Sequence, residues 1–73
     1  MKIDRPFDAL NSSKEKEIVV ELKNNEKYKG KLLAFDIHLN LTLSDAKKIA
    51  EKEETVGNMI IRGDAITIIK GLQ

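Results

Sequence analysis

The chain has 73 residues, no cysteine, one histidine, and 13 lysine and arginine residues against 12 aspartate and glutamate residues, for a formal net charge of +1. This length predicts one small domain, 1–73, and the composition excludes disulfides and cysteine-based zinc sites, so stability must come from close packing or from burial against other chains. The near-zero net charge argues against a protein that holds nucleic acid mainly by neutralising phosphates. The sequence shows no apolar run of the ~20 residues that a membrane span needs and no signal-peptide pattern, so we expect a cytoplasmic protein with no membrane partner.

The N-terminal segment predicts a short helix over residues 3–12. Ile3, Phe7 and Leu10 are spaced at i, i+4 and i+7, which places them on one helix face. Pro6, near the start of the segment, is typical of a first helical turn. We expect this helix to cover one end of a core.

The segment after the helix predicts a first strand and a tight turn. Ile18, Val20 and Leu22 alternate with their neighbours at the strand period of two residues. The pair Asn24-Asn25 follows, and asparagine tolerates the positive φ of tight turns better than most residues.

Gly30 stands in the middle of the next predicted strand, which falls within the run "EKYKGKLLAFD", residues 26–36. A glycine inside a strand usually marks a sharp bend or a close backbone approach, so we expect the sheet to curl here. Lys27, Lys29 and Lys31 share one parity in this strand. That row is consistent with a solvated strand face and with a basic surface for a nucleic acid.

A third strand is predicted from the regular alternation that begins at His38. Leu39, Leu41 and Leu43 fall on the side expected to face the core, and polar residues fall on the other side. The strongly polar segment 47–55 is expected to extend this strand outward before the chain turns.

The two last predicted strands flank the tight-turn tripeptide Arg62-Gly63-Asp64. One helix and about five strands over residues 17–70 predict an all-β fold with an N-terminal helix, namely a small, strongly bent, five-stranded SH3-like barrel.

Both flanks of the tripeptide are more apolar than a half-exposed edge strand should be, and an exposed apolar edge promotes aggregation. We therefore expect these edges to pair with neighbouring copies and to close a ring.

Two polar clusters lie at predicted junctions between strands: Asp36-His38-Asn40 and Arg62-Gly63-Asp64. Each cluster also has a purely structural interpretation. His38 could be a surface histidine, and the first cluster's acid and amide could serve the turn. The second cluster could be a surface ion pair around a backbone glycine.

The residues of both clusters lie in stretches that resemble a known family. "LKNNEKYKGKLLAFDIHLNLTLSDA" resembles the first Sm motif, with its internal glycine, its Phe-Asp, and its Asn followed by Leu-x-Leu. "GNMIIRGDAITII" resembles the second motif, whose core is Ile-Arg-Gly-Asp-x-Ile. The match runs from about Ile18 to Ile69, and the chain is most similar to an archaeal Sm-like (LSm) protein.

This resemblance implies a bent five-stranded barrel, the Sm fold, capped by the helix and assembled into a homo-oligomeric ring of roughly six to eight copies, with seven favoured. The fourth and fifth strands would pair edge to edge between subunits. The ring would bind U-rich single-stranded RNA near its central pore and serve in RNA processing, chaperoning or stability. RNA-processing proteins are further expected partners.

The resemblance also implies which residues bind the RNA, with one uridine per subunit: Asp36, His38, Asn40, Arg62, Gly63 and Asp64. His38 and Arg62 would stack on the two faces of the base, and Asn40 would bind its edge. Asp36 would orient Asn40 or the loop, and the last two residues would contribute backbone contacts. General chemistry agrees, because unpaired RNA bases are read by stacking on planar groups and by hydrogen bonds to their edges.

Other functions fit the sequence less well. An enzyme could be assembled from Asp36, His38 and Ser44, but no nucleophile stands in a Gly-x-Ser-x-Gly elbow and no ligand spacing indicates a metal. We therefore expect no catalytic residue, no metal and no cofactor. The remaining alternatives are a structural or protein-binding ring scaffold and a small curved-barrel nucleic-acid-binding module without base specificity.

Overall fold

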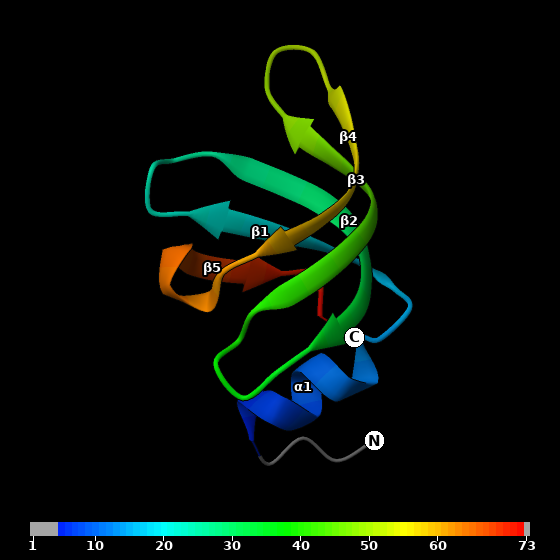
Figure 1. Ribbon diagram of the computed structural model, residues 1–73, viewed down its shortest axis with the longest axis vertical. Helices are drawn as coiled ribbons and strands as arrows, with labels where there is room; N and C mark the ends of the chain where they lie inside the picture. The colour runs from blue at the N-terminus through cyan, green and yellow to red at the C-terminus, as the bar shows by residue number, and fades with distance from the viewer. Residues whose placement is uncertain (1–4, 73) are drawn as a thin grey trace.

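The computed structural model describes residues 5–72. They form one α-helix, five strands and a 3-10 turn: α1 (Pro6–Ser12), β1 (Glu17–Leu22), β2 (Lys27–Phe35), β3 (Leu41–Ile49), β4 (Glu54–Ile61), η1 (Gly63–Ala65) and β5 (Ile66–Lys70) (Figure 1). The predicted fold class, a bent five-stranded sheet with an N-terminal helix, is confirmed. Ile3 and Asp4, which the predicted helix included, lie outside the described residues.

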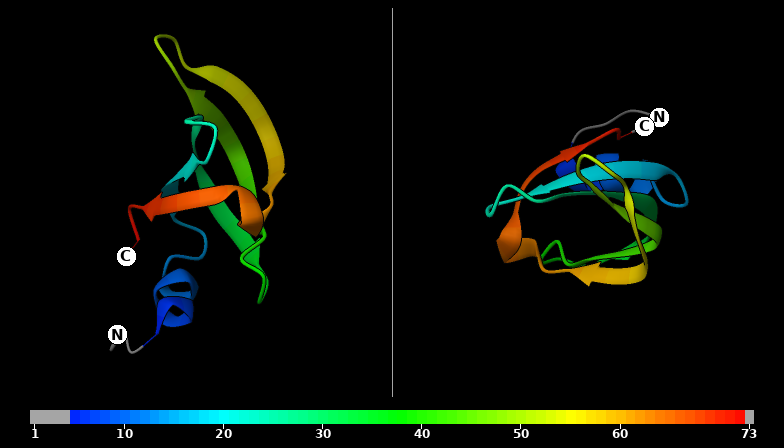
Figure 2. Two further views of the ribbon diagram at one scale, coloured as in Figure 1. Left: turned by 90° about the vertical axis from the view of Figure 1, so that its left-hand side faces the viewer. Right: turned by 90° about the horizontal axis from the view of Figure 1, so that it is seen from above.

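The five strands form one antiparallel sheet in the order β4-β3-β2-β1-β5. Seen from above, this sheet curls around a common interior (Figure 2). Strands β4 and β5 are thus the two terminal strands of the sheet, although only Arg62 and the short turn Gly63–Ala65 lie between them in the sequence.

The core follows the strand period that the sequence predicts. Ile18 and Val20 are fully buried, and Leu22 packs against the core at the end of the same strand. The polar residue Ser13 is buried as well, and the buried apolar residues come from the helix and from four strands: Leu10, Ile18, Val20, Leu32, Leu41, Leu43, Ala46 and Ile61. Burial of this kind contributes about 25 cal/mol for each Å² of apolar surface removed from water.

The sheet bends where β2 crosses β3 at Gly30. A Cβ built on Gly30 would lie 3.1 Å from Ala46 Cα and 3.2 Å from both Ala46 Cβ and Leu43 Cβ, so a side chain has little room there. The pairing of β2 with β3 shifts register between Lys29 and Lys31. The partner strand is also irregular here, because Asp45 adopts a positive φ of 52°. The predicted bend at Gly30 therefore coincides with a bulged crossing of two strands.

Helix α1 closes one end of the barrel. The backbone N–H of Arg5 donates to Asp8 Oδ2 at 3.1 Å before the first turn, and Leu10 enters the core. Phe7 contacts Phe35 of β2 edge to face, with ring centroids 5.0 Å apart and planes at 71°. Within residues 5–72, no helix has the length and apolar character needed to cross a membrane.

The hairpin of β3 and β4 projects away from α1 (Figure 1). Ion pairs hold the outer part of this hairpin to β2 and to the β1–β2 turn. Glu53 pairs with Lys29 of β2, and Lys48 Nζ lies 2.6 Å from Glu26 Oε2. The side-chain contact with Lys29 holds the pKa of Glu53 below its usual value.

The two terminal strands expose apolar side chains, as the sequence suggested. Ile60 of β4 is 70% exposed, Val56 of the same strand is 44% exposed, and Ile68 of β5 is 44% exposed. Backbone groups along a terminal strand can pair with another chain. Both edges are therefore suited to strand addition.

The predicted position of Leu39 is wrong. The sequence alternation placed it in a strand beside Leu41 and Leu43, but β3 begins at Leu41 and Leu39 lies in the preceding turn. Leu39 has a positive φ of 61° and is 39% exposed. The turn, held by its own hydrogen bonds, forces a left-handed conformation that a leucine adopts only at an energetic cost.

Candidate nucleic-acid interface

Two loops that are far apart in the sequence meet at one end of the sheet. The β2–β3 loop spans residues 36–40, and the second loop follows β4 at Arg62. They are joined by a hydrogen bond from the backbone N–H of Gly63 to Asn40 Oδ1 at 2.8 Å. Together with the adjoining strands, these loops enclose an open groove lined by Ala34, Phe35, Asp36, His38, Asn40, Thr42, Ile60, Arg62, Gly63 and Asp64.

The carboxylate of Asp36 organises the first loop. Its Oδ1 accepts hydrogen bonds from the backbone N–H groups of His38 at 2.9 Å and of Asn40 at 3.0 Å, and its Oδ2 accepts from Asn40 Nδ2 at 2.9 Å. The Asn40 side chain, followed by these backbone donors, lowers the pKa of Asp36 below its usual value. Asp36 therefore orients both the loop and Asn40, and it carries a full negative charge at neutral pH.

The side-chain amide of Asn40 links the two loops, and its orientation is determined by its partners. Gly63 N–H can only donate and the Asp36 carboxylate can only accept, so the amide oxygen faces Gly63 and the amide nitrogen faces Asp36. One amide N–H and one oxygen lone pair remain unused in these contacts. Asn40 can thus hold the loops together and still offer both a donor and an acceptor to the edge of a base.

Gly63 is a glycine because the two loops touch at this residue. A Cβ on Gly63 would lie 1.9 Å from the carbonyl oxygen of His38 and 3.0 Å from the carbonyl carbons of His38 and Leu39. No side chain fits without separating the loops. The structural reason for this glycine is therefore space and not backbone conformation.

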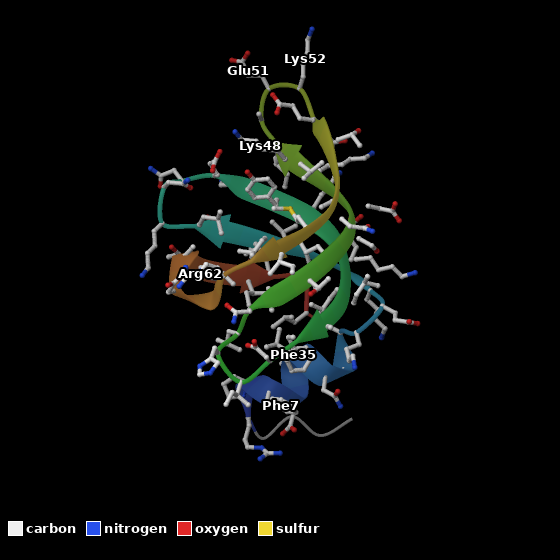
Figure 3. The ribbon with its side chains drawn as sticks, in the orientation of Figure 1. Phe7, Phe35, Lys48, Glu51, Lys52 and Arg62 are labelled. Carbon is white, nitrogen blue, oxygen red and sulfur yellow. The ribbon has the colours of Figure 1, made fainter. Side chains whose placement is uncertain are left out.

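His38 and Arg62 contribute the two planar groups of the groove, one from each loop. Arg62 lies at the end of β4, far from the hairpin tip that carries Glu51 and Lys52 (Figure 3). Its Nη2 donates to Asp64 Oδ2 at 2.9 Å, and both side chains are largely exposed. His38 is exposed as well, so both planar side chains are accessible from the groove.

Four residues of the groove were not singled out as site residues from the sequence: Ala34, Phe35, Thr42 and Ile60. Ala34, Thr42 and Ile60 are cross-strand neighbours, because Ala34 pairs with Thr42 and Thr42 pairs with Ile60. Each lies two residues along its strand from a predicted site residue and so faces the same side of the sheet. If the two loops are expected to meet, the strand period of two residues therefore predicts that these three residues line the groove between them.

All six predicted site residues line this single groove, and their contacts with RNA stay a prediction. The structure brings Asp36, Asn40 and Gly63 into one hydrogen-bonded unit and pairs Arg62 with Asp64. Across residues 5–72, no group of three or more histidine, aspartate or glutamate side chains is arranged to hold a metal ion.

Comparisons with known proteins agree with this architecture. The LSM domain model matches residues 8–71 of the chain. A relative from Thermococcus sibiricus, described as an snRNP Sm-like protein, is 40% identical over 72 residues, which cover 96% of this chain and 95% of the relative.

Solved structures of archaeal Sm proteins have the same fold. The Pyrococcus abyssi Sm protein in complex with a uridine heptamer matches with a TM-score of 0.85 and 38% identity over 92% of this chain and 97% of that chain. The P. aerophilum SmAP1 heptamer matches with a TM-score of 0.90 and 29% identity over 99% of both chains. The family match over most of the chain, the fold and the relatives lead to one conclusion: this chain belongs to the LSM domain family and is similar to its archaeal Sm-like members.

Proposed function

We propose that copies of this chain assemble into a closed ring of about seven subunits, which binds U-rich single-stranded RNA at the grooves around its pore. The protein acts as a binding ring in RNA processing, chaperoning or stability, and not as an enzyme. It works in the cytoplasm, where RNA-processing proteins are further partners. Residues 1–73 form a single domain in this proposal.

One observation carries the RNA-binding proposal: the Gly63–Asn40 hydrogen bond fixes the loop of His38 against the loop of Arg62. Two planar side chains and an amide with unused hydrogen-bonding capacity thereby share one open groove. This combination suits an unpaired base, which stacks on planar groups and presents its edge to an amide. The complex of the P. abyssi Sm protein with a uridine heptamer supports uridine as the base.

The exposed terminal strands support the ring. A head-to-tail contact between β4 of one copy and β5 of the next would cover Ile60 and Ile68, which are exposed in the single chain. The matching proteins from P. aerophilum and P. abyssi support this arrangement, because the former is a heptamer and the latter binds a seven-nucleotide ligand. Repetition of a weak site around a ring raises the affinity for a single RNA strand through effective concentration.

Fluorescence anisotropy with a labelled oligouridylate, an oligoadenylate and an RNA duplex tests the proposal. The oligouridylate should bind most tightly, and Arg62→Ala should weaken its binding by at least about tenfold, because base stacking is worth about 1–3 kcal/mol for each base. Lys52→Ala is the matched control, since it removes one positive charge at the exposed hairpin tip (Figure 3).

Native mass spectrometry of the same samples separates binding from assembly. The wild type, Arg62→Ala and Lys52→Ala should all give the same ring mass. Equal affinity of the wild type for oligouridylate and duplex contradicts the RNA-binding proposal. A monomeric or dimeric mass at micromolar concentration contradicts the ring.

A further inference from the structure

The groove carries a net negative charge, although its proposed ligand is a polyanion. Among the described residues that line it, Asp36 and Asp64 are carboxylates and Arg62 is the single fixed cation. Counted over these fixed charges, two carboxylates and one guanidinium leave a net charge of −1 for each subunit. Attraction of phosphates therefore does not explain binding in this groove.

Both carboxylates are held in the groove by specific contacts. The two oxygens of Asp36 accept hydrogen bonds from its own loop, which keep it ionised and occupy it. Asp64 Oδ2 lies 2.9 Å from Arg62 Nη2, and these two side chains are 66% and 79% exposed. The charge of Arg62 is thus balanced by a residue two positions along the chain.

This pairing changes what the guanidinium group can offer to RNA. An arginine binds phosphate through the N–H groups on its edge and through its full positive charge. The Asp64 carboxylate takes part of that edge and repels an approaching phosphate. The two planar faces of Arg62 remain accessible, and they are the surfaces on which a base stacks.

We propose that Asp64 is a specificity-determining residue that restricts Arg62 to stacking on bases and keeps phosphates out of the groove. The inference rests on the proposed RNA-binding function and names the chemical group that enters the site. That group is an uncharged, flat base, and the sugar–phosphate backbone stays outside the groove. Binding should then depend only weakly on salt.

Asp64→Asn tests this role because it removes the charge and keeps the size and shape of the side chain. It leaves the groove neutral and frees the edge of Arg62. Glu51→Gln is the matched control, since it removes the same charge from the exposed tip of the β3–β4 hairpin, outside the groove (Figure 3).

The two probes are a labelled oligouridylate and a labelled abasic ribose–phosphate oligomer of the same length, which has the backbone charge and no bases. Their affinities are measured by fluorescence anisotropy over roughly 50 to 200 mM salt. The wild type should bind the abasic oligomer at least about tenfold more weakly than oligouridylate, because stacking is lost. Asp64→Asn should bind the abasic oligomer more tightly, and the slope of log affinity against log salt should steepen by about 0.7 for each phosphate newly contacted.

Two results would overturn the role of Asp64. One is an Asp64→Asn protein with unchanged salt slope and unchanged affinity for the abasic oligomer. The other is a variant that loses affinity for both probes, because Asp64 would then serve only the shape of its loop. In either case the wild type still binds oligouridylate and the proposed function stands. A wild type that binds neither probe refutes the proposed function itself, and this inference with it.

Discussion

The side chain of Asn40 has two different partners, one of which needs a hydrogen-bond acceptor and the other a donor. Its oxygen accepts from the Gly63 N–H, and its nitrogen donates to the Asp36 carboxylate. An amide supplies one acceptor and one donor group in nearly the same volume as a carboxylate, which supplies acceptors alone. The identity of this residue is therefore fixed by the contact between the loops, independently of any base that it binds.

Asn40→Asp is expected to destabilise the protein at neutral pH, because it sets a second carboxylate against Asp36 in an isosteric side chain. In the folded wild type the pKa of Asp36 lies below its usual value of 3.8, so the ionised carboxylate stabilises the fold. This stabilisation is fully present above pH 3.8 and is lost as the pH falls through the folded pKa of Asp36. In the variant, acid protonates one of the two carboxylates and relieves their repulsion. The difference between the urea midpoints of the two proteins should therefore be largest near neutrality and should shrink towards pH 4.

Asn58→Asp is a suitable control, since it makes the same substitution at an exposed side chain in β4, outside this network. A gap between wild type and Asn40→Asp that stays constant with pH would show that the two carboxylates do not interact.

At this scale the sequence predicted six of the residues that line the groove, and the resemblance implied that Asp36 orients Asn40 or the loop, but the contact between the two loops was not predicted. Asp36, Asn40 and Gly63 stand out as turn residues, and their resemblance to a family motif placed them near a base. The clash of a Gly63 Cβ with the His38 carbonyl group was not predictable, because it depends on the separation of two loops in space. The left-handed turn at Leu39 was missed for a related reason. Hydrogen bonds within the loop override the alternating pattern there.

At the scale of the elements, the bend of the sheet and the position of the groove depend on different contacts between strands. Gly30 packs against Ala46 and Leu43 at the bulged crossing of β2 with β3. Leu41 of β3 pairs with Ile61 of β4, so this register sets Asn40 beside Arg62 and brings the turn after β4 against the loop between β2 and β3. The register between neighbouring strands therefore positions the groove, whereas Gly30 allows the close crossing at the bend.

Gly30→Val is expected to lower the free energy of unfolding by about 1–3 kcal/mol, because the new side chain must displace two neighbouring residues that leave it no space. Urea denaturation followed by circular dichroism measures the change. Lys31→Val, on the same strand and exposed, serves as the control for adding the same side chain. Equal stability of Gly30→Val and wild type would show that the sheet does not need a glycine for its curvature.

The elements themselves were largely predictable. The period of two in β1 and the position of Gly30 reflect local steric and burial rules, and these rules act on short segments of sequence. The order of the strands depends instead on which distant segments pair, so only the family resemblance suggested it. The bulge at Asp45 has no marker in the sequence, because an aspartate with a positive φ looks like any other polar residue of the strand.

At the scale of the whole molecule, the single chain leaves apolar surface at both ends of its sheet. Ile60 and Ile68 lie on opposite terminal strands, and each is more exposed than the core-facing residues beside it. A chain of 73 residues buries a limited core of its own. Pairing of these strands between copies would extend the sheet and the apolar interior together.

Ile68→Lys is expected to prevent assembly, because it places a charge on the apolar edge of β5 that a neighbour would cover. Native mass spectrometry and light scattering should then report a monomer or small species instead of the ring. Ile37→Lys makes the same substitution in the β2–β3 loop, where Ile37 is 84% exposed and belongs to neither terminal strand, and it should assemble normally. An intact ring formed by Ile68→Lys would show that β5 is not an assembly surface.

The placement of the two free strands at opposite ends of the sheet also affects how the oligomer grows. A pair of molecules joined β4 to β5 still has one unsatisfied strand at each extremity, and so does every longer open arc. Only closure into a circle pairs the last two unpaired strands with each other. This step does not cost the loss of translational freedom that accompanies the addition of each further molecule. Partly built arcs should therefore be scarce at equilibrium, and dilution should convert complete circles almost directly into single molecules.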